Sequence, residues 1–197
     1  LVPRWQDRHL VTIVTSVDPN EKLGAGGVGV NRQIGSEQIL PYSIRFENLQ
    51  TATAPAQEVV VIDALDGATL DLNTVILSAI KFGKRANGLP WTVEFPPGPS
   101  SNTQDVDLRP EQQLIVHVGY NLDRATGMLS WSLTSIDPAT DLPPVSDLVG
   151  FLPPNITPPE GEGSVLFTVL PKPGLGGGSA IRNRATINFD GASQQTP

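Results

Sequence analysis

Short stretches in which apolar and polar residues alternate, or in which β-branched residues follow one another, recur along the chain. They occupy residues 9–17, 38–48, 57–65, 74–82, 91–95, 113–122, 128–136, 163–170 and 180–189. Alternation with a period of two is typical of β-strands that bury one face. In the stretch 128–136, Leu129, Trp131, Leu133 and Ser135 fall on one face, and serine and threonine dominate the other. The pattern therefore predicts about nine strands, each with one face toward the core and one face toward solvent.

Turn residues separate these stretches, and no segment has a helical period. Gly, Pro, Asn and Asp recur between strands at a spacing that favours an all-β sandwich of two antiparallel sheets. Residues 123–127 predict a hairpin between 113–122 and 128–136. Two stretches, 96–105 and 137–163, are expected to be long Pro-rich loops. The second is expected to be ordered over one end of the sandwich, because long unstructured connections are uncommon in compact domains.

The domain boundaries follow from the same pattern. We interpret residues 14–190 as one β-sandwich domain. Residues 1–13 are expected to be an N-terminal extension, a linker or part of a first strand, and residues 191–197 a C-terminal tail. The only methionine is Met128, so the sequence looks like an excised or processed piece.

Composition and charge narrow the function classes. The chain has 197 residues, 39% of them apolar, which is enough to bury a core. A formal net charge of −7 disfavours nucleic acid as a partner. The chain has no cysteine and two histidines, which excludes thiolate chemistry and disfavours a soft-metal site. No apolar run is long enough to span a bilayer, so no membrane insertion is expected.

Oxygen-bearing side chains cluster at several turns. The stretch "SVDPNEK" (16–22) places Asp18 and Asn20 directly after an apolar run. Side-chain oxygens at a sharp turn suit Ca²⁺, which takes six to eight oxygen ligands. Further ligands would have to come from elsewhere, and the candidates at other turns and strand ends are Glu47, Asp137, Asp141 and Asp190. The alternative for Asp18 and Asn20 is that they only bond to nearby backbone N–H groups in an Asx turn. The alternative for the other four is that each is a solvated acid at a turn or strand end.

Catalytic motifs are not evident. Glu160 and Glu162 could be proposed as the paired acids of a glycosidase, but their spacing does not favour carboxyl groups on opposite sides of a sugar bond. The sequence contains no nucleophile elbow, zincin helix motif or phosphate-binding loop. His117 is expected to be a satisfied strand residue. Trp91 and Trp131 are expected in the core, with sugar stacking by an exposed aromatic as the alternative.

Several phrases together resemble a known family. "SVDPNEK", "LPYSIRFENLQ", "GEGSVLFTVLPKPGL" and "IRNRATINFD" are similar to the repeat-type β-sandwich domain of large secreted bacterial surface proteins. The family's opening motif falls on Asp18, Pro19, Asn20 and Lys22. Its closing motif falls on Asn183, Ala185, Ile187, Phe189 and Asp190. The sequence departs from the family pattern after Asp190, which puts any metal ligand from that tail in doubt.

The resemblance implies an extracellular or cell-surface protein built as a string of modules. It leads us to expect an immunoglobulin-like sandwich that serves as a non-enzymatic structural or adhesive module. The oxygen-bearing turns add the expectation that Ca²⁺ stiffens the module. The apolar stretch within residues 1–15 adds the expectation that the chain self-associates by adding a strand to a neighbour's sheet. Its expected partners are neighbouring modules of the same or identical chains. The alternative is a carbohydrate-binding module that uses exposed aromatics to bind glycan.

Overall fold

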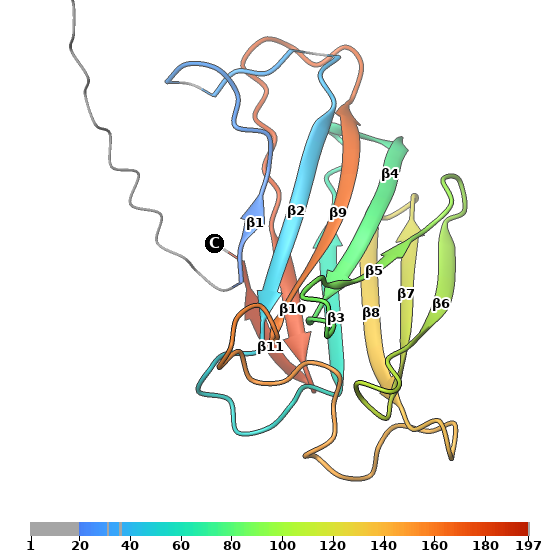
Figure 1. The fold of residues 1–197 in the computed structure, drawn as a ribbon. Helices are drawn as coiled ribbons and strands as arrows, with labels where there is room; N and C mark the ends of the chain where they lie inside the picture. Colours follow the sequence, from blue (N-terminus) through green and yellow to red (C-terminus); the bar gives the residue numbers. More distant parts are fainter. Residues whose placement is uncertain (1–19, 31, 36, 197) are drawn as a thin grey trace, which may run out of the picture.

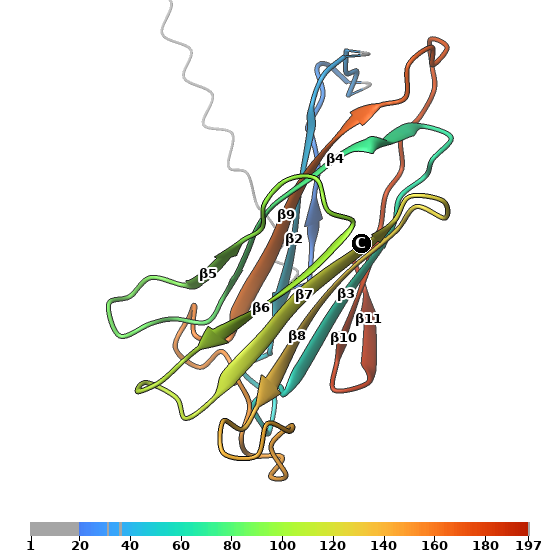
Figure 2. The same cartoon turned by 90° about the vertical axis from the view of Figure 1, so that its right-hand side faces the viewer.

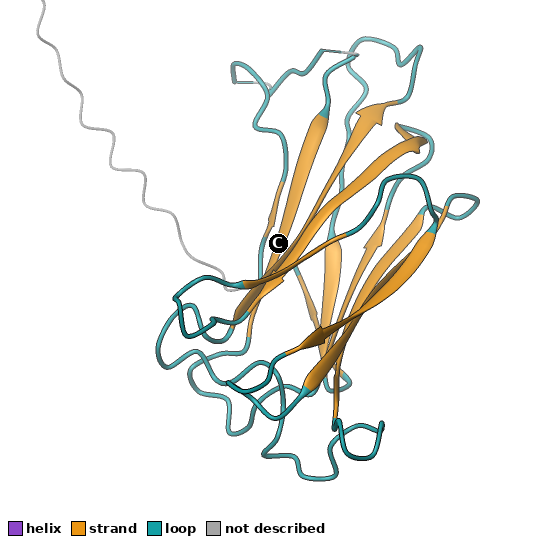
Figure 3. Ribbon diagram, turned by 45° about the vertical axis from the view of Figure 1, so that its right-hand side comes forward, coloured by secondary structure: helices purple, strands orange, loops and turns teal. Residues whose placement is uncertain are grey.

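The computed structural model describes residues 20–30, 32–35 and 37–196. These residues contain no helix and form two antiparallel sheets packed face to face (Figures 1 and 3). The expected all-β sandwich is therefore confirmed. The first sheet contains, in spatial order, β1 (Lys22–Leu23), β2 (Leu40–Glu47), β9 (Glu162–Pro171), β4 (Leu70–Phe82) and β5 (Trp91–Glu94). The second contains β11 (Ala192–Gln195), β10 (Ala185–Phe189), β3 (Glu58–Ala64), β8 (Met128–Ile136), β7 (Ile115–Asp123) and β6 (Ser101–Asp107).

The core lies between the sheets and is built from the inward positions of each strand. On β8, Leu129, Trp131, Leu133 and Ser135 are all buried, as the alternation predicts. Aromatic rings link the sheets, since Trp131 lies 5.7 Å from the ring of Phe167 on β9. A strand of a two-layer sandwich needs only one apolar face, which is why the period of two identified these strands.

The predicted hairpin is present. Strands β7 and β8 pair in antiparallel register from Ile115↔Ile136 to Asp123↔Met128. In the connecting turn, the Asp123 carboxylate accepts a hydrogen bond from the Ala125 N–H at 2.9 Å, and Gly127 adopts a φ of 78°. The turn therefore closes through the acid at its start and the glycine at its end.

Three edge strands lie where the sequence predicted no strand, namely the two-residue β1 in the first sheet and β6 and β11 in the second. Strand β6 occupies much of the expected loop 96–105, and β11 lies in the expected tail. Both are outer strands of the second sheet, and neither has a fully buried position. Without a buried face there is no hydrophobic alternation to detect. The chain therefore has eleven strands in its described part, and the strand expected over 9–17 lies outside it.

Other strand limits also differ from the pattern. Strand β4 begins at Leu70 rather than 74, and its register against β9 is irregular between Asp71 and Ile76. Strand β10 begins at Ala185 rather than 180, because its pairing with β3 starts at Ala185↔Asp63, near the end of β3. Strand length is set here by the partner strand, which a single segment cannot reveal.

The long loop 137–163 is ordered and packs over one end of the sandwich, as expected (Figure 2). Phe151 and Leu152 are fully buried. The ring of Phe151 meets that of Phe82 edge-on at 5.3 Å, and the Phe151 N–H donates to Ser135 Oγ at 3.0 Å. The loop is therefore part of the core rather than a linker.

Candidate functional site

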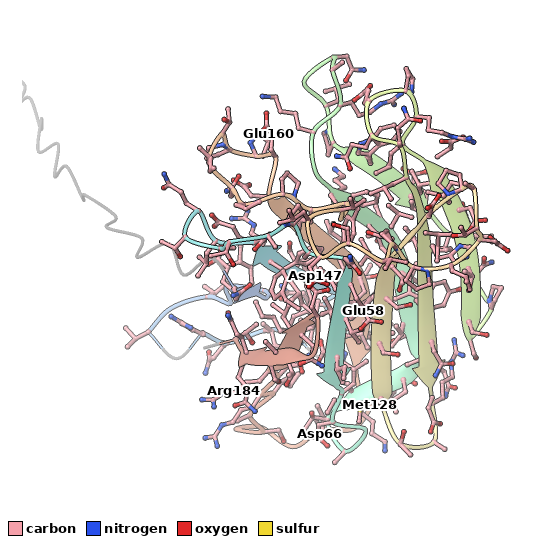
Figure 4. The ribbon with its side chains drawn as sticks, turned by 90° about the horizontal axis from the view of Figure 1, so that it is seen from below. Glu58, Asp66, Met128, Asp147, Glu160 and Arg184 are labelled. Atoms are coloured by element: carbon pink, nitrogen blue, oxygen red, sulfur yellow. The ribbon has the colours of Figure 1, made fainter. Side chains whose placement is uncertain are left out.

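The predicted calcium ligands lie at one rim but do not converge. Strands β2, β8 and β10 all end at the lower rim in Figure 1, which places Glu47, Asp137 and Asp190 there. The described residues contain no group of three or more acidic or histidine side chains positioned to hold a metal ion. Asp18 lies outside the described residues. Figure 4 shows this rim from below, with Glu58 at the start of β3 and with Asp147 and Glu160 both in the loop 137–163.

Asp190 holds two strands together through backbone hydrogen bonds. Its carboxylate accepts from the N–H of Gln57 at 3.0 Å and of Glu58 at 2.8 Å. Asp190 itself has a φ of 46°, in the left-handed region that aspartate tolerates in turns. The residue therefore joins the β10–β11 turn to the start of β3.

Asp137 and Asp141 form a turn of their own. The Asp137 carboxylate accepts from the Ala139 N–H at 2.8 Å, and the Asp141 N–H donates to the Asp137 carbonyl at 2.9 Å. Asp141 has a φ of 58°. This is an Asx turn, whereas the alternative to metal binding expected for these two residues was a solvated turn acid.

Glu47 belongs to a clamp around Asn155. The buried Asn155 amide donates to Glu47 at 2.9 Å and to Glu162 at 3.1 Å, and its oxygen accepts from the Gly161 N–H at 3.1 Å. Glu47 and Glu162 face each other on β2 and β9. The second acid of the Glu160/Glu162 pair is thus engaged in structure, while Glu160 lies 3.7 Å from the Lys84 ammonium.

The remaining sequence candidates also have structural partners. His117 on β7 contacts Asp105 opposite it on β6, as a satisfied strand histidine. Trp131 is 1% exposed, and the ring of Trp91 lies 4.6 Å under the Arg85 guanidinium. In the described part of the chain, the exposed large apolar side chains are aliphatic or methionine, and Trp91, Tyr42 and Phe189 are partly buried.

A buried polar cluster joins the two sheets, and sequence reasoning did not assign it a role. Lys22 on β1 contacts Asp63 on β3, with side chains 2% and 0% exposed. Asn183, just before β10, donates from Nδ2 to Asp63 Oδ2 at 3.5 Å. The Lys22 ammonium also lies over two aromatic rings, 4.8 Å from the centre of Tyr42 and 5.4 Å from that of Phe167.

Burial shifts the pKa values of Lys22 and Asp63 in the directions that disfavour their charged forms. Burial lowers the pKa of Lys22 to about 8, although the Asp63 carboxylate acts in the opposite direction. Burial raises the pKa of Asp63, opposed by Lys22 and Asn183. Low polarity disfavours both charges, and their attraction compensates only in part. The signal in the sequence was the position of Asp63, because it continues the inward series of Val59 and Val61.

Asn20 adds a second polar link beside this cluster. Its amide contacts the Gln194 side chain of β11, and its oxygen accepts from the Glu47 N–H at 3.4 Å. Asn20 is only 3% exposed. The residue therefore connects the start of β1 to both sheets.

A groove of about 430 Å³ lies across the first sheet near its lower end. Glu21, Arg45, Glu47, Lys81 and Glu162 are among its lining residues. Arg45 and Glu21 pair at 3.0 Å, and the two glutamates at its floor bond to Asn155. The carboxyl groups of Glu21, Glu47 and Glu162 in the groove therefore already have partners.

A comparison with protein-family models finds a match over part of the chain. Residues 18–87 match a domain of unknown function, DUF7619. No curated protein matches the sequence. No helix in the described residues is long and apolar enough to cross a membrane.

Several solved structures share a general similarity of fold. The C-terminal domain of the Streptococcus agalactiae antigen I/II polypeptide BspA matches with 12% identity and a TM-score of 0.42, covering 90% of this chain and 47% of that one. The C-terminal domain of the Streptococcus pyogenes antigen I/II-family protein AspA matches with 9% identity and a TM-score of 0.46, covering 90% and 44%. The group B streptococcus pilus 2b backbone protein matches with 16% identity and a TM-score of 0.45, covering 83% and 53%. The chain thus spans about half the length of these proteins, and a similarity of this size carries no functional argument.

Proposed function

We propose that the chain is a non-enzymatic structural module of an extracellular or cell-surface bacterial protein. One observation carries the proposal: the rim acids that could have been reactive are bonded to the chain's own N–H groups. Asp190 bonds to β3, Asp137 closes a turn, and Glu47 holds Asn155. The extracellular setting rests on the resemblance of the opening and closing motifs to secreted surface repeats.

The terminal strands support a load-bearing role. Strands β1 and β11 are edge strands of opposite sheets, and Asn20 and Gln194 link them. Strand β1 pairs with β2 over only two residues, so a pull on the chain would separate it easily without these side-chain links. The polar contacts at this edge therefore resist force between the sheets.

Single-molecule stretching tests the proposal. The chain is placed between copies of a well-characterised reference module and pulled from its ends. If the module bears load, it should unfold only at a force comparable with that of the reference modules, or its folded segment should not lengthen at all. Extension of the whole folded segment at forces too low to register as a rupture would contradict the proposal.

Self-association by strand addition is the finer part of the proposal. Strand β11 carries Ala, Ser and Gln at exposed positions on the edge of its sheet, without the charges or proline that commonly block edge pairing. An identical chain is the partner that this edge would accept. Light scattering after size exclusion should show species larger than a monomer, and these should disappear in Ser193→Pro. A monomer at all concentrations would contradict this part alone.

Calcium stiffening stays a prediction, because its best ligand, Asp18, lies outside the described residues. The described donors do not fit a metal site by themselves, since their oxygens accept backbone or amide hydrogen bonds. The proposed function therefore uses no metal. If calcium does bind, the melting temperature rises in calcium relative to chelator. Equal melting temperatures would remove the prediction.

A further inference from the structure

The cluster of Lys22, Asp63 and Asn183 has the composition of a self-reacting site. We propose that Lys22 Nζ attacks the side-chain amide of Asn183 and forms a covalent amide cross-link, with Asp63 moving the protons. The bond would join β1 of the first sheet to the segment that leads into β10 of the second. This inference goes beyond the proposed function and does not depend on it, because it concerns a covalent modification of the interior.

Asp63 brings the two reacting groups together. Lys22 Nζ and Asn183 Nδ2 both donate to the same atom, Asp63 Oδ2. The three side chains come from β1, β3 and the segment before β10, which only the packing of the two sheets places side by side. Groups fixed in one cage react as one unit, without the entropic cost of an encounter.

The surroundings favour the reactive forms. An amine is a nucleophile only when it is unprotonated, and the aromatic cage of Tyr42 and Phe167 excludes the water that would stabilise its charge. The lowered pKa of Lys22 favours the unprotonated amine, and the raised pKa of Asp63 favours the protonated acid. A proton can pass from the ammonium to the carboxylate, which leaves a neutral amine beside a neutral acid.

The step balances without any additional reagent. The amine nitrogen forms a bond to Asn183 Cγ, and the Cγ–Nδ2 bond breaks. Asp63 first takes a proton from the ammonium, then gives one to the leaving nitrogen and takes the second proton from the attacking nitrogen. Ammonia leaves, Asp63 ends protonated, and nothing is oxidised or reduced.

Two buried oxygen atoms fit this assignment. Within the described residues, Asp63 Oδ1 and Asn183 Oδ1 are buried without a hydrogen-bond partner. A buried carbonyl without a donor is costly. A protonated Asp63 supplies the kind of donor that the Asn183 carbonyl lacks, and the same donor would stabilise the negative charge that develops on this oxygen during attack.

Mass spectrometry of the natively folded full chain tests the inference. The expected intact mass is lower than the sequence mass by one molecule of ammonia. Proteolysis should then yield one branched fragment that contains both Lys22 and Asn183. Neither readout needs a variant, so a failure of variants to fold leaves the test intact.

Variants assign the roles. Lys22→Arg keeps the positive charge but removes the nucleophile, Asn183→Ala removes the amide, and Asp63→Asn removes the proton carrier. Each should restore the full sequence mass. Lys81→Arg, on the exposed face of β4, is the matched control and should retain the ammonia loss.

Three results would overturn the inference. A folded chain with the full sequence mass excludes the cross-link. Loss of water, with Lys22 joined to Asp63, excludes Asn183 as the acyl donor. Loss of ammonia confined to an unbranched peptide, such as a succinimide at Asn87-Gly88, also excludes it. A folded Asp63→Asn variant that still cross-links would remove Asp63 from the mechanism.

Stretching separates this inference from the proposed function. An uncross-linked module lengthens by about 560 Å when the segment between Lys22 and Asn183 extends. A cross-linked one cannot gain that length at any force below bond rupture. A full-length rupture at high force would therefore support the load-bearing role and contradict the cross-link.

Discussion

Removal of the Asn155 side chain should open the lower rim of the sandwich. Asn155 is 4% exposed and lies in the long loop 137–163. Its side chain makes three hydrogen bonds, two to the carboxylates of Glu47 and Glu162 and one to the Gly161 N–H. Its backbone N–H also donates to the Asn48 carbonyl at 2.8 Å. Asn155→Ala leaves the backbone contact but removes the other three.

The size of the destabilisation depends on which polar groups lose their hydrogen-bond partner in Asn155→Ala. The Gly161 N–H is buried, and a buried donor without an acceptor costs about 1–3 kcal/mol. Water can reach Glu162, which is exposed, so the lost bonds to the two carboxylates add only about 1 kcal/mol. We expect a loss of about 2–4 kcal/mol in the free energy of unfolding. For a domain of this size, that lowers the melting temperature by about 5–15 °C.

Thermal and urea unfolding, followed by circular dichroism, measure this loss. The matched control is Asn87→Ala, because Asn87 lies in an exposed turn and accepts only the Leu89 N–H at 3.0 Å. The control should stay within about 0.5 kcal/mol of wild type. An Asn155→Ala variant as stable as the control would refute the clamp.

Asn155→Asp refines the test through its pH dependence. It keeps an oxygen for the Gly161 N–H but places a third carboxylate beside Glu47 and Glu162. Like charges raise the pKa of the new carboxyl group, so its cost is full at neutral pH and falls as acid protonates it. The stability difference from wild type should therefore shrink between neutral and mildly acidic pH. A constant difference would contradict the proximity of the three carboxylates.

Two further changes test the core and the surface. Gly163→Ala would place a Cβ 2.2 Å from the ring of Phe46, which is 1% exposed, so we expect the free energy of unfolding to fall by about 1–3 kcal/mol. Gly176→Ala, which places its Cβ in open space, is the control and should cause no measurable fall. The Arg109 side chain, through its hydrogen bond, lowers the pKa of Asp107 to about 2. The stability that this contact contributes is therefore present above pH 3.8 and is lost as the pH falls through 2. NMR titration of the Asp107 carboxyl group should find a midpoint near 2 in the wild type and a higher midpoint in Arg109→Gln. An unchanged midpoint in the variant would disprove the contact.

Local pattern alone was enough for the fold class and most strands. The alternation in β8 predicted its buried face, and the acid and glycine of residues 123–127 predicted its hairpin with β7. These features depend on one segment and its immediate turn. A strand that buries one face must alternate wherever it lies in the sandwich, so the sequence shows it directly.

Pairing between distant segments decided the rest. Strands β6 and β11 exist because a neighbouring strand offers its backbone, and neither has an apolar face of its own. The sequence showed the rim acids as possible oxygen ligands for a metal. Whether Asp190 binds a metal or the backbone of β3 depends on a contact between residues that lie 132 positions apart in the sequence.

The buried cluster depends on tertiary structure most of all. The sequence by itself determined that Lys22 and Asn183 lie in the opening and closing motifs. It also determined that Asp63 alternates in step with Val59 and Val61 and so occupies an inward-facing position of its strand. Only the stacking of the two sheets placed the amine, the acid and the amide in contact in the interior. Burial there shifts the pKa of the amine and of the acid toward their uncharged forms, because the cost of burying a charge depends on the surroundings and not on the residue type.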